Sequence, residues 1–314
     1  MPSLQKKYFR FQINLIVLIL IAVLSFTYKT SIAQNINPSS KGKSDFVSQD
    51  EKEFNKIKQL KVKTRLKYAV FNDIKGYMNN KKILIVKETF NKRGSLSEMV
   101  EYNSSGNIIS SYKFSYDAKG KPKKAQGVDD TGRSNTQVSK YDSRGNEIER
   151  NLISIGRKKT ESKSLFKYDK ENNLIEIKNY FDNKFTDQQN NEYKNGIRIR
   201  TTMLNEKGDT VLVSIPEYNS DGKLIGEKST NQNIVYKYDL NGNLSKMVDA
   251  ETKRIYISDE NGNIVEHKMF LLDGRRQLRL VFKYDRKGLQ SEQIRYDNNE
   301  AVVLHYVYEY EYYK

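Results

Sequence analysis

The sequence predicts an all-β protein, an antiparallel β-hairpin repeat array that forms an extended, twisted sheet. Three observations predict this fold. A Tyr-Asp-x-x-Gly turn recurs along the chain, apolar and polar residues alternate before each turn, and Tyr is abundant (22 residues) while Trp and Cys are absent. Tyr suits half-buried strands because its ring can be covered while its hydroxyl stays hydrated. An N-terminal signal helix and one short capping helix complete the expected fold.

Residues 1–33 have the pattern of a secretory signal peptide. Basic residues open the chain, the apolar run 15–24 is short for a bilayer span of about 20 residues, and Ser31-Ile32-Ala33 gives a small-x-small cleavage pattern. We expect cleavage after Ala33, with an uncleaved anchor as the alternative, and no transmembrane span after cleavage. The chain would then be periplasmic, at the cell surface or extracellular, and with no Cys it would not be a lipoprotein.

Residues 34–60 predict a flexible linker and then one short helix. The linker is rich in Ser, Asn, Lys and Gly. Ser48 can cap the helix, which runs to Leu60 with apolar residues three apart and acidic residues in its first turn. We expect this helix to cover the first repeat. Residues 61–314 form the predicted β-hairpin repeat domain.

The repeat domain contains about nine two-strand units, each built on one strong turn. Strong turns recur every 20 to 27 residues, and a weaker series of Gly-containing turns lies between them, so the two kinds of turn should occupy opposite edges of the sheet. In a strong turn Asp accepts hydrogen bonds from the following amides, and Gly supplies the left-handed conformation. The residues assigned to this structural role are Tyr116, Asp117, Gly120, Tyr141, Asp142, Gly145, Tyr168, Asp169, Tyr218, Gly222, Tyr238, Asp239, Gly242, Tyr284, Asp285 and Gly288.

Each strand that enters a strong turn alternates between two kinds of side chain. Tyr112, Phe114 and Tyr116 are separated by Lys113 and Ser115, and the other units follow the same pattern. One face of the sheet is therefore predicted to be aromatic and the other charged. The aromatic residues should stack as cross-strand pairs, and the Lys and Glu residues should protect exposed strand edges.

The segments YKYDLNGNL at 236–244 and FKYDRKGLQ at 282–290 resemble the YD repeats of the Rhs family, over roughly residues 85–300. The resemblance implies an extended, spiralling β-sheet that can enclose a toxin or display a surface for adhesion and carbohydrate contact. Arg seldom follows the turn glycine here, and nine units are few for a closed shell. The MORN type of hairpin repeat is a weaker likeness, since its dense Gly and Trp pattern is missing.

We expect no catalytic site, no metal site and no cofactor. The two histidines, His267 and His305, lie in separate units without the spacing of a metal pair or catalytic dyad. The Asp-x-Asn-Gly-Asn runs at Asp239 and Asp259 lack the closing Glu of a calcium loop, so metal-free turns are expected. Paired carboxylates for glycoside hydrolysis stay open as an alternative, because a repeat array can bring distant acids together. The chain is not expected to be an enzyme.

The expected function is a non-catalytic binding or scaffold surface at the cell envelope or outside the cell, with an unknown polysaccharide or protein ligand. After processing, 51 basic against 39 acidic residues leave a net charge of about +12, so an anionic polysaccharide is one candidate ligand, and export excludes intracellular nucleic acid. One alternative is a component of an Rhs-like toxin or antagonism system: a carrier, shell remnant or immunity-like partner. The other is an outer-membrane β-barrel, which a leader plus alternating strands also fits.

Overall fold

The computed structural model of the 314-residue chain describes residues 49–72, 78–230 and 232–314. The predicted signal peptide, its cleavage at Ala33 and most of the linker lie outside the described residues. The short helix expected after Ser48 is present as α2 (Gln49–Gln59). Within the described ranges, no helix is long and apolar enough to cross a bilayer.

Twenty strands follow α2, and each pairs antiparallel with its neighbours in chain order. The strands are β1 (Val62–Asn72), β2 (Met78–Phe90), β3 (Leu96–Tyr102), β4 (Ile108–Tyr116), β5 (Pro122–Asp129), β6 (Ser134–Tyr141), β7 (Glu147–Ile155), β8 (Lys159–Tyr168), β9 (Leu174–Phe181), β10 (Lys184–Lys194), β11 (Ile197–Leu204), β12 (Thr210–Tyr218), β13 (Leu224–Ser229), β14 (Asn233–Tyr238), β15 (Leu244–Val248), β16 (Thr252–Ser258), β17 (Ile264–Leu271), β18 (Arg276–Tyr284), β19 (Gln290–Tyr296) and β20 (Val302–Tyr312).

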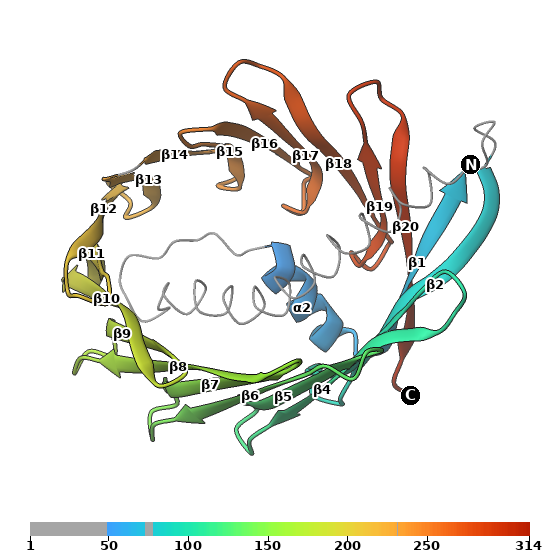
Figure 1. Cartoon of the computed structure of the whole chain (residues 1–314). Coiled ribbons are helices and arrows are strands. Elements are labelled where there is room, and N and C mark those ends of the chain that lie inside the picture. The colour runs from blue at the N-terminus through green and yellow to red at the C-terminus, as the bar shows by residue number, and fades with distance from the viewer. Residues whose placement is uncertain (1–48, 73–77, 231) are drawn as a thin grey trace.

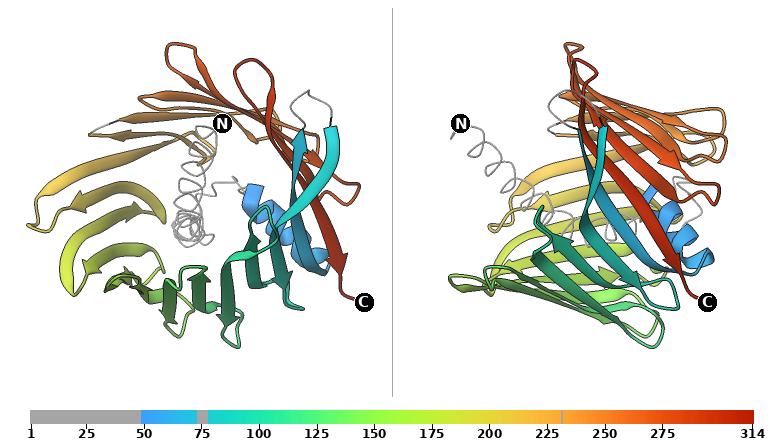
Figure 2. Two further views of the ribbon diagram at one scale, coloured as in Figure 1. Left: turned by 45° about the vertical axis from the view of Figure 1, so that its right-hand side comes forward. Right: turned by 90° about the vertical axis from the view of Figure 1, so that its right-hand side faces the viewer.

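The sheet closes on itself, because β1 pairs with β20 as well as with β2. Figure 1 shows the resulting ring, and Figure 2 shows its wall from two further directions. The predicted all-β class is right, but the predicted extended, twisted or spiralling sheet is wrong. An open sheet of hairpins leaves two edge strands with unpaired backbone groups, and closure into a barrel removes both edges. Side chains support the seam, where the Lys67 ammonium lies 4.0 Å from the centre of the Tyr306 ring.

The turns alternate between the two rims of the barrel. The strong turns follow the even-numbered strands and share one rim, called here the YD rim, and the weaker series lies on the opposite rim. In the strong turn after β4, Asp117 Oδ1 accepts a hydrogen bond from the Lys121 amide at 2.8 Å, and Gly120 has a φ of +82°. A bulge follows between Ser115 and Tyr116 in the ladder with β5, which increases the local twist.

The other strong turns repeat this geometry. The Oδ1 atoms of Asp142, Asp169, Asn219, Asp239 and Asp285 each accept a hydrogen bond from the amide four residues later. Left-handed conformations occur at Gly145, Asn172, Gly222, Gly242 and Gly288. The weaker turn after β3 has the same form, because Gly106 (φ +83°) donates to the Asn103 carbonyl at 3.0 Å. The weaker turns at Gly132, Gly208 and Gly274 share this form, whereas the turn after β9 instead has two successive left-handed residues, Asp182 and Asn183.

The buried apolar cluster is small and lies where α2 meets the YD rim. Ile57 of α2 packs there with Val62, Phe90 and Leu289, which come from both ends of the repeat domain. The Lys52 ammonium also donates to the Gly262 carbonyl at 2.5 Å. The helix therefore covers the last repeats as well as the first.

Candidate functional site

The contacts of α2 identify the inner wall of the barrel, since the helix lies within the ring of strands (Figure 1). Ile57 packs on Phe90, and Glu53 pairs with Arg65 at 2.6 Å. Side chains alternate between faces along a strand, and facing residues of neighbouring strands share a face. Following the facing residues from one strand to the next extends this assignment around the ring. The tyrosines that open the strong turns therefore lie on the inner wall. The charged residues between them face outward.

The hydroxyl groups of these tyrosines form a repeated bond between units, called here the tyrosine latch. Tyr116 donates to the Leu96 carbonyl at 2.7 Å, and Tyr141 donates to the Pro122 carbonyl at 2.7 Å. In both cases the acceptor lies two residues after the glycine of the preceding strong turn, beyond the end of the backbone ladder. The latch therefore satisfies a carbonyl that the next strand does not reach.

The latch recurs around most of the barrel. Its other members are Tyr168 to Glu147 (3.1 Å), Tyr193 to Leu174 (3.2 Å), Tyr238 to Leu224 (2.7 Å), Tyr284 to Ile264 (2.9 Å) and Tyr310 to Gln290 (2.8 Å). At the seam, Tyr313 donates to the Phe90 carbonyl at 2.5 Å and so joins the last strand to the first strong turn. Burial raises the pKa of Tyr116 and of Tyr141 to about 12, so both hydroxyls stay protonated donors at neutral pH.

A cluster of amide and hydroxyl side chains lies on the inner wall of β8 to β11. Asn179 Nδ2 donates to Asp187 Oδ1 at 2.6 Å, and Gln189 Nε2 donates to Asn191 Oδ1 at 3.0 Å. Thr201 Oγ1 donates to the same Asn191 oxygen at 2.8 Å. These bonds fix the orientation of the amides. Side chains that retain further donors and acceptors can then bind a polar ligand without first being ordered.

Several charged residues of the inner wall form ion pairs. Arg150 Nε donates to Glu147 Oε1 at 2.9 Å, and Arg198 Nη2 lies 3.3 Å from Glu227 Oε1. Arg65 pairs with Glu88 as well as with Glu53 of α2. Opposite charges at these distances cancel most of their field in the lumen, so the inner wall is polar but nearly neutral at these positions.

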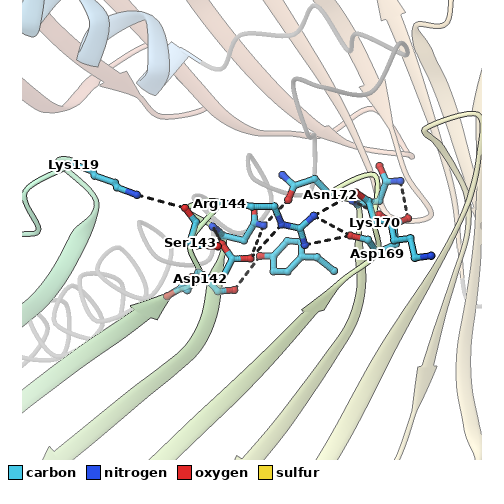
Figure 3. A network of polar contacts seen from close by, with 11 residues as sticks. Lys119, Asp142, Ser143, Arg144, Asp169, Lys170 and Asn172 are labelled. Carbon is cyan, nitrogen blue, oxygen red and sulfur yellow. Dashed lines mark hydrogen bonds and ion pairs between the residues drawn. The ribbon is translucent and has the colours of Figure 1, made fainter.

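On the YD rim, basic side chains join one strong turn to the next (Figure 3). Arg93 Nη1 donates to the Ala118 carbonyl at 3.1 Å, and Arg144 Nη1 donates to the Lys170 carbonyl at 3.3 Å. Lys119, between them, lies 3.5 Å from the Ser143 carbonyl. The sequence-based assignment missed this role, although a Lys or Arg directly before the turn glycine in the first three units is its signal.

The outer wall carries ion pairs next to the YD rim in some of the units. The outward-facing residue directly before a turn tyrosine lies opposite a residue of the next strand, four positions after the turn glycine. Lys140 thus lies 3.0 Å from Glu149, and Lys283 lies 3.2 Å from Glu292. The outer wall also exposes apolar side chains near both rims, among them Ile155 at the opposite rim and Ile257 beside the YD rim. Charge and apolar surface are therefore both present on the outside.

The histidines do not form a shared site. His267 lies on the inner wall, stacked on Tyr256 with ring centres 4.7 Å apart, and its burial lowers its pKa. His305 lies on the outer wall, where Nε2 is 3.0 Å from Glu292 Oε2. No group of three or more potential His, Cys, Asp or Glu metal ligands occurs in the described part of the chain. The carboxylates of Asp239 and Asp259 accept hydrogen bonds from their own turns.

Comparison with known proteins gives distant likenesses. No family model and no curated protein matches the chain. Solved structures that match include the TcdB2-TccC3-Cdc42 complex (10% identity, TM-score 0.29, 76% of this chain and 19% of that chain). Porin-like proteins from Bacteroides uniformis ATCC 8492 (11%, 0.36, 80% and 97%) and Bacteroides vulgatus ATCC 8482 (7%, 0.28, 80% and 99%) also match.

The chain spans about a fifth of the toxin-complex chain that it matches. At TM-scores below 0.5, none of these likenesses bears on function. The YD-repeat pattern remains a resemblance of turn and strand sequence, set in a barrel that closes after 20 strands.

The tyrosine latch predicts that the variant Tyr116→Phe is less stable than the wild type. Removal of the hydroxyl leaves the Leu96 carbonyl without its donor, which should lower the free energy of unfolding by about 1 kcal/mol at pH 7. Chemical denaturation of the full processed chain measures this loss. Tyr180→Phe is the matched control, because Tyr180 faces outward and contacts Phe185 edge-on.

The difference in stability between the wild type and Tyr116→Phe should also depend on pH. The pKa of Tyr116 is raised to about 12 from 10.0, so the folded state retains a proton that the unfolded state releases. This contribution to stability is complete below pH 10 and is lost as the pH rises toward 12. The stability difference between the wild type and Tyr116→Phe should therefore narrow above pH 10. A loss no larger than that of Tyr180→Phe, or a difference that does not change with pH, would contradict the latch.

Proposed function

We propose that the chain is a non-catalytic barrel of the cell envelope that binds a polysaccharide along its inner wall. One observation carries the proposal: tyrosine rings, amides and hydroxyls line the inside, whereas the outside carries ion pairs such as Lys140 with Glu149. Sugar rings pack their C–H faces on aromatic side chains and exchange hydrogen bonds with amides, so this inner wall suits them. Barrels of 16 to 18 strands already enclose an aqueous channel, and 20 strands leave comparable room.

The hydrogen bonds and ion pairs of the acidic residues support a non-catalytic role. The strong-turn aspartates accept backbone hydrogen bonds, and inner-wall acids such as Glu147 and Glu227 pair with arginines. Glycoside hydrolysis needs two carboxyl groups facing one sugar across a gap, one of them free to donate a proton. The envelope location is supported by the leader pattern of residues 1–33.

A second candidate is an outer-membrane barrel, and complete closure favours it, because a bilayer tolerates no open sheet edge. The closed ring fits this alternative better than the open binding sheet expected from the sequence. Two features of the outer wall favour contact with water. Strand β15 has five residues, whereas spanning strands need about 9 to 11. The outward ion pair of Lys268 and Glu266 lies near the middle of β17, where a lipid-facing Lys costs about 2–4 kcal/mol.

Extraction of the chain from the cell envelope distinguishes the polysaccharide-binding barrel from the outer-membrane barrel. We expect 1 M salt without detergent to release the folded chain, because its outer wall carries ions that water solvates. Retention in the membrane until detergent is added would contradict a water-exposed outer wall and would favour the outer-membrane barrel. An immunoblot of the two fractions is the measurement.

Binding through the inner wall predicts that Gln189→Leu weakens polysaccharide binding about tenfold, the equivalent of one lost hydrogen bond of about 1.4 kcal/mol. The matched control is Asn190→Leu, since Asn190 neighbours Gln189 in β10 and points to the other face. A panel of purified neutral and acidic polysaccharides, titrated against the processed chain, provides the affinities. Equal effects of both substitutions, or no binding of any polysaccharide by the wild type, would overturn the proposal.

A further inference from the structure

A cavity of about 420 Å³ lies on the YD rim between the first two strong turns. Lys92 and Arg93, from the turn after β2, line one part of it, and Phe114 and Tyr116, at the end of β4, line another. The volume falls within the range of small-ligand pockets, about 300–1,000 Å³. Two cations and two aromatic rings thus line one cavity at the mouth of the barrel.

Asp117, the acidic residue that lines the cavity, offsets only one of these two positive charges and forms no ion pair with Lys92 or Arg93. Asp117 Oδ1 caps its own turn by accepting the Lys121 amide at 2.8 Å. Arg93 uses Nη1 for the Ala118 carbonyl at 3.1 Å, and a guanidinium has five N–H donors, so it retains others. Lys92 makes no ion pair with any residue that the structure describes. The cavity therefore retains a net positive charge and N–H donors that are available to a ligand.

Further basic residues extend this charge along the rim. They belong to the two following turns, to α2 and to the last strong turn, and they are Lys119, Arg144, Lys56, Lys58 and Lys287. Lys58 of α2 packs against Gly94, in the same turn as Lys92 and Arg93, and Lys56 packs near Gly288 in the last strong turn. Asp142, in one of these turns, pairs with Arg144 at 3.8 Å, so Arg144 adds little net charge. Asp285, in the last strong turn, accepts a hydrogen bond from the Leu289 amide and forms no ion pair within the described part of the chain. A sustained excess of one charge at a mouth raises the local concentration of anions.

We propose that this cavity is a subsite for a carboxylate-bearing sugar of an acidic polysaccharide. The Arg93 guanidinium and the Lys92 ammonium hold the carboxylate, and the Phe114 ring packs against the apolar face of the sugar. A guanidinium forms paired charge-assisted hydrogen bonds with a carboxylate, which gives geometric selection as well as attraction. The subsite rests on the proposed function and deepens it, because it assigns a ligand class to the mouth of the lumen.

The test compares oligogalacturonate with its methyl-esterified form, which keeps the sugar chain and removes the charge. The double variant Lys92→Gln/Arg93→Gln is matched with Arg157→Gln/Lys158→Gln, which removes two positive charges from the opposite rim. For the full processed chain, we expect the wild type to bind oligogalacturonate at least tenfold more tightly than the ester. The first double variant should lose that preference, and the control should keep it. The slope of the logarithm of the binding constant against the logarithm of the salt concentration should become shallower by about one in the first variant alone, because the subsite binds one carboxylate.

Three results would overturn the subsite. The wild type could bind both forms equally, the two double variants could lose affinity equally, or the first double variant could bind as the wild type does. Thermal melting of each variant checks that the fold is retained. A failure of the subsite leaves the inner-wall effect of Gln189→Leu on neutral polysaccharides intact, whereas failure of the proposed function removes that effect as well.

Discussion

The pairing of the first strand with the last is the constraint on which the whole structure depends. Hairpins joined in chain order leave two sheet edges, and each edge presents a row of unpaired backbone groups. β1 and β20 pair these rows along most of their length. Lys67 and Tyr308 face one another within that seam, and Tyr313 ties the end of the chain to Phe90. Only six apolar side chains are buried among the described residues, so ladder hydrogen bonds and closure take the place of a large core.

Closure also gives the two faces of the sheet different surroundings. The inner face holds the tyrosines, and their hydroxyls bond to carbonyls that the ladder leaves unpaired, as Tyr141 does with Pro122. The outer face holds ion pairs such as Lys140 with Glu149 beside the same turns. One repeat motif thus builds the rim, supports the inner wall and keeps part of the outer wall hydrated. The basic side chains of the YD rim lie at the mouth of the lumen, where the proposed ligand would enter.

Much of the local structure could be predicted from the sequence, because its causes are local. The turn geometry at Asp117 and Gly120, the alternation in β4 and the helix after Ser48 each depend on a few adjacent residues. Closure could not be predicted, since it depends on the summed twist and curvature of 20 strands and brings together residues far apart in sequence. The tyrosine latch and the bond from Arg93 to the next turn were missed for a related reason: both join neighbouring units, whereas the motif was interpreted one unit at a time.

A disulfide across the seam tests closure most directly, because the natural chain contains no Cys. Leu66 and Glu309 face one another across β1 and β20, and Lys140 and Glu149 do so within one hairpin. After mild oxidation, Leu66→Cys/Glu309→Cys should form an intramolecular disulfide as completely as Lys140→Cys/Glu149→Cys, measured in both variants as the loss of free thiols that a maleimide can label. The seam disulfide closes a long loop, so that variant should also migrate faster than its reduced form on a denaturing gel. A disulfide in the hairpin pair with none in the seam pair would show that the sheet is open and would contradict the barrel.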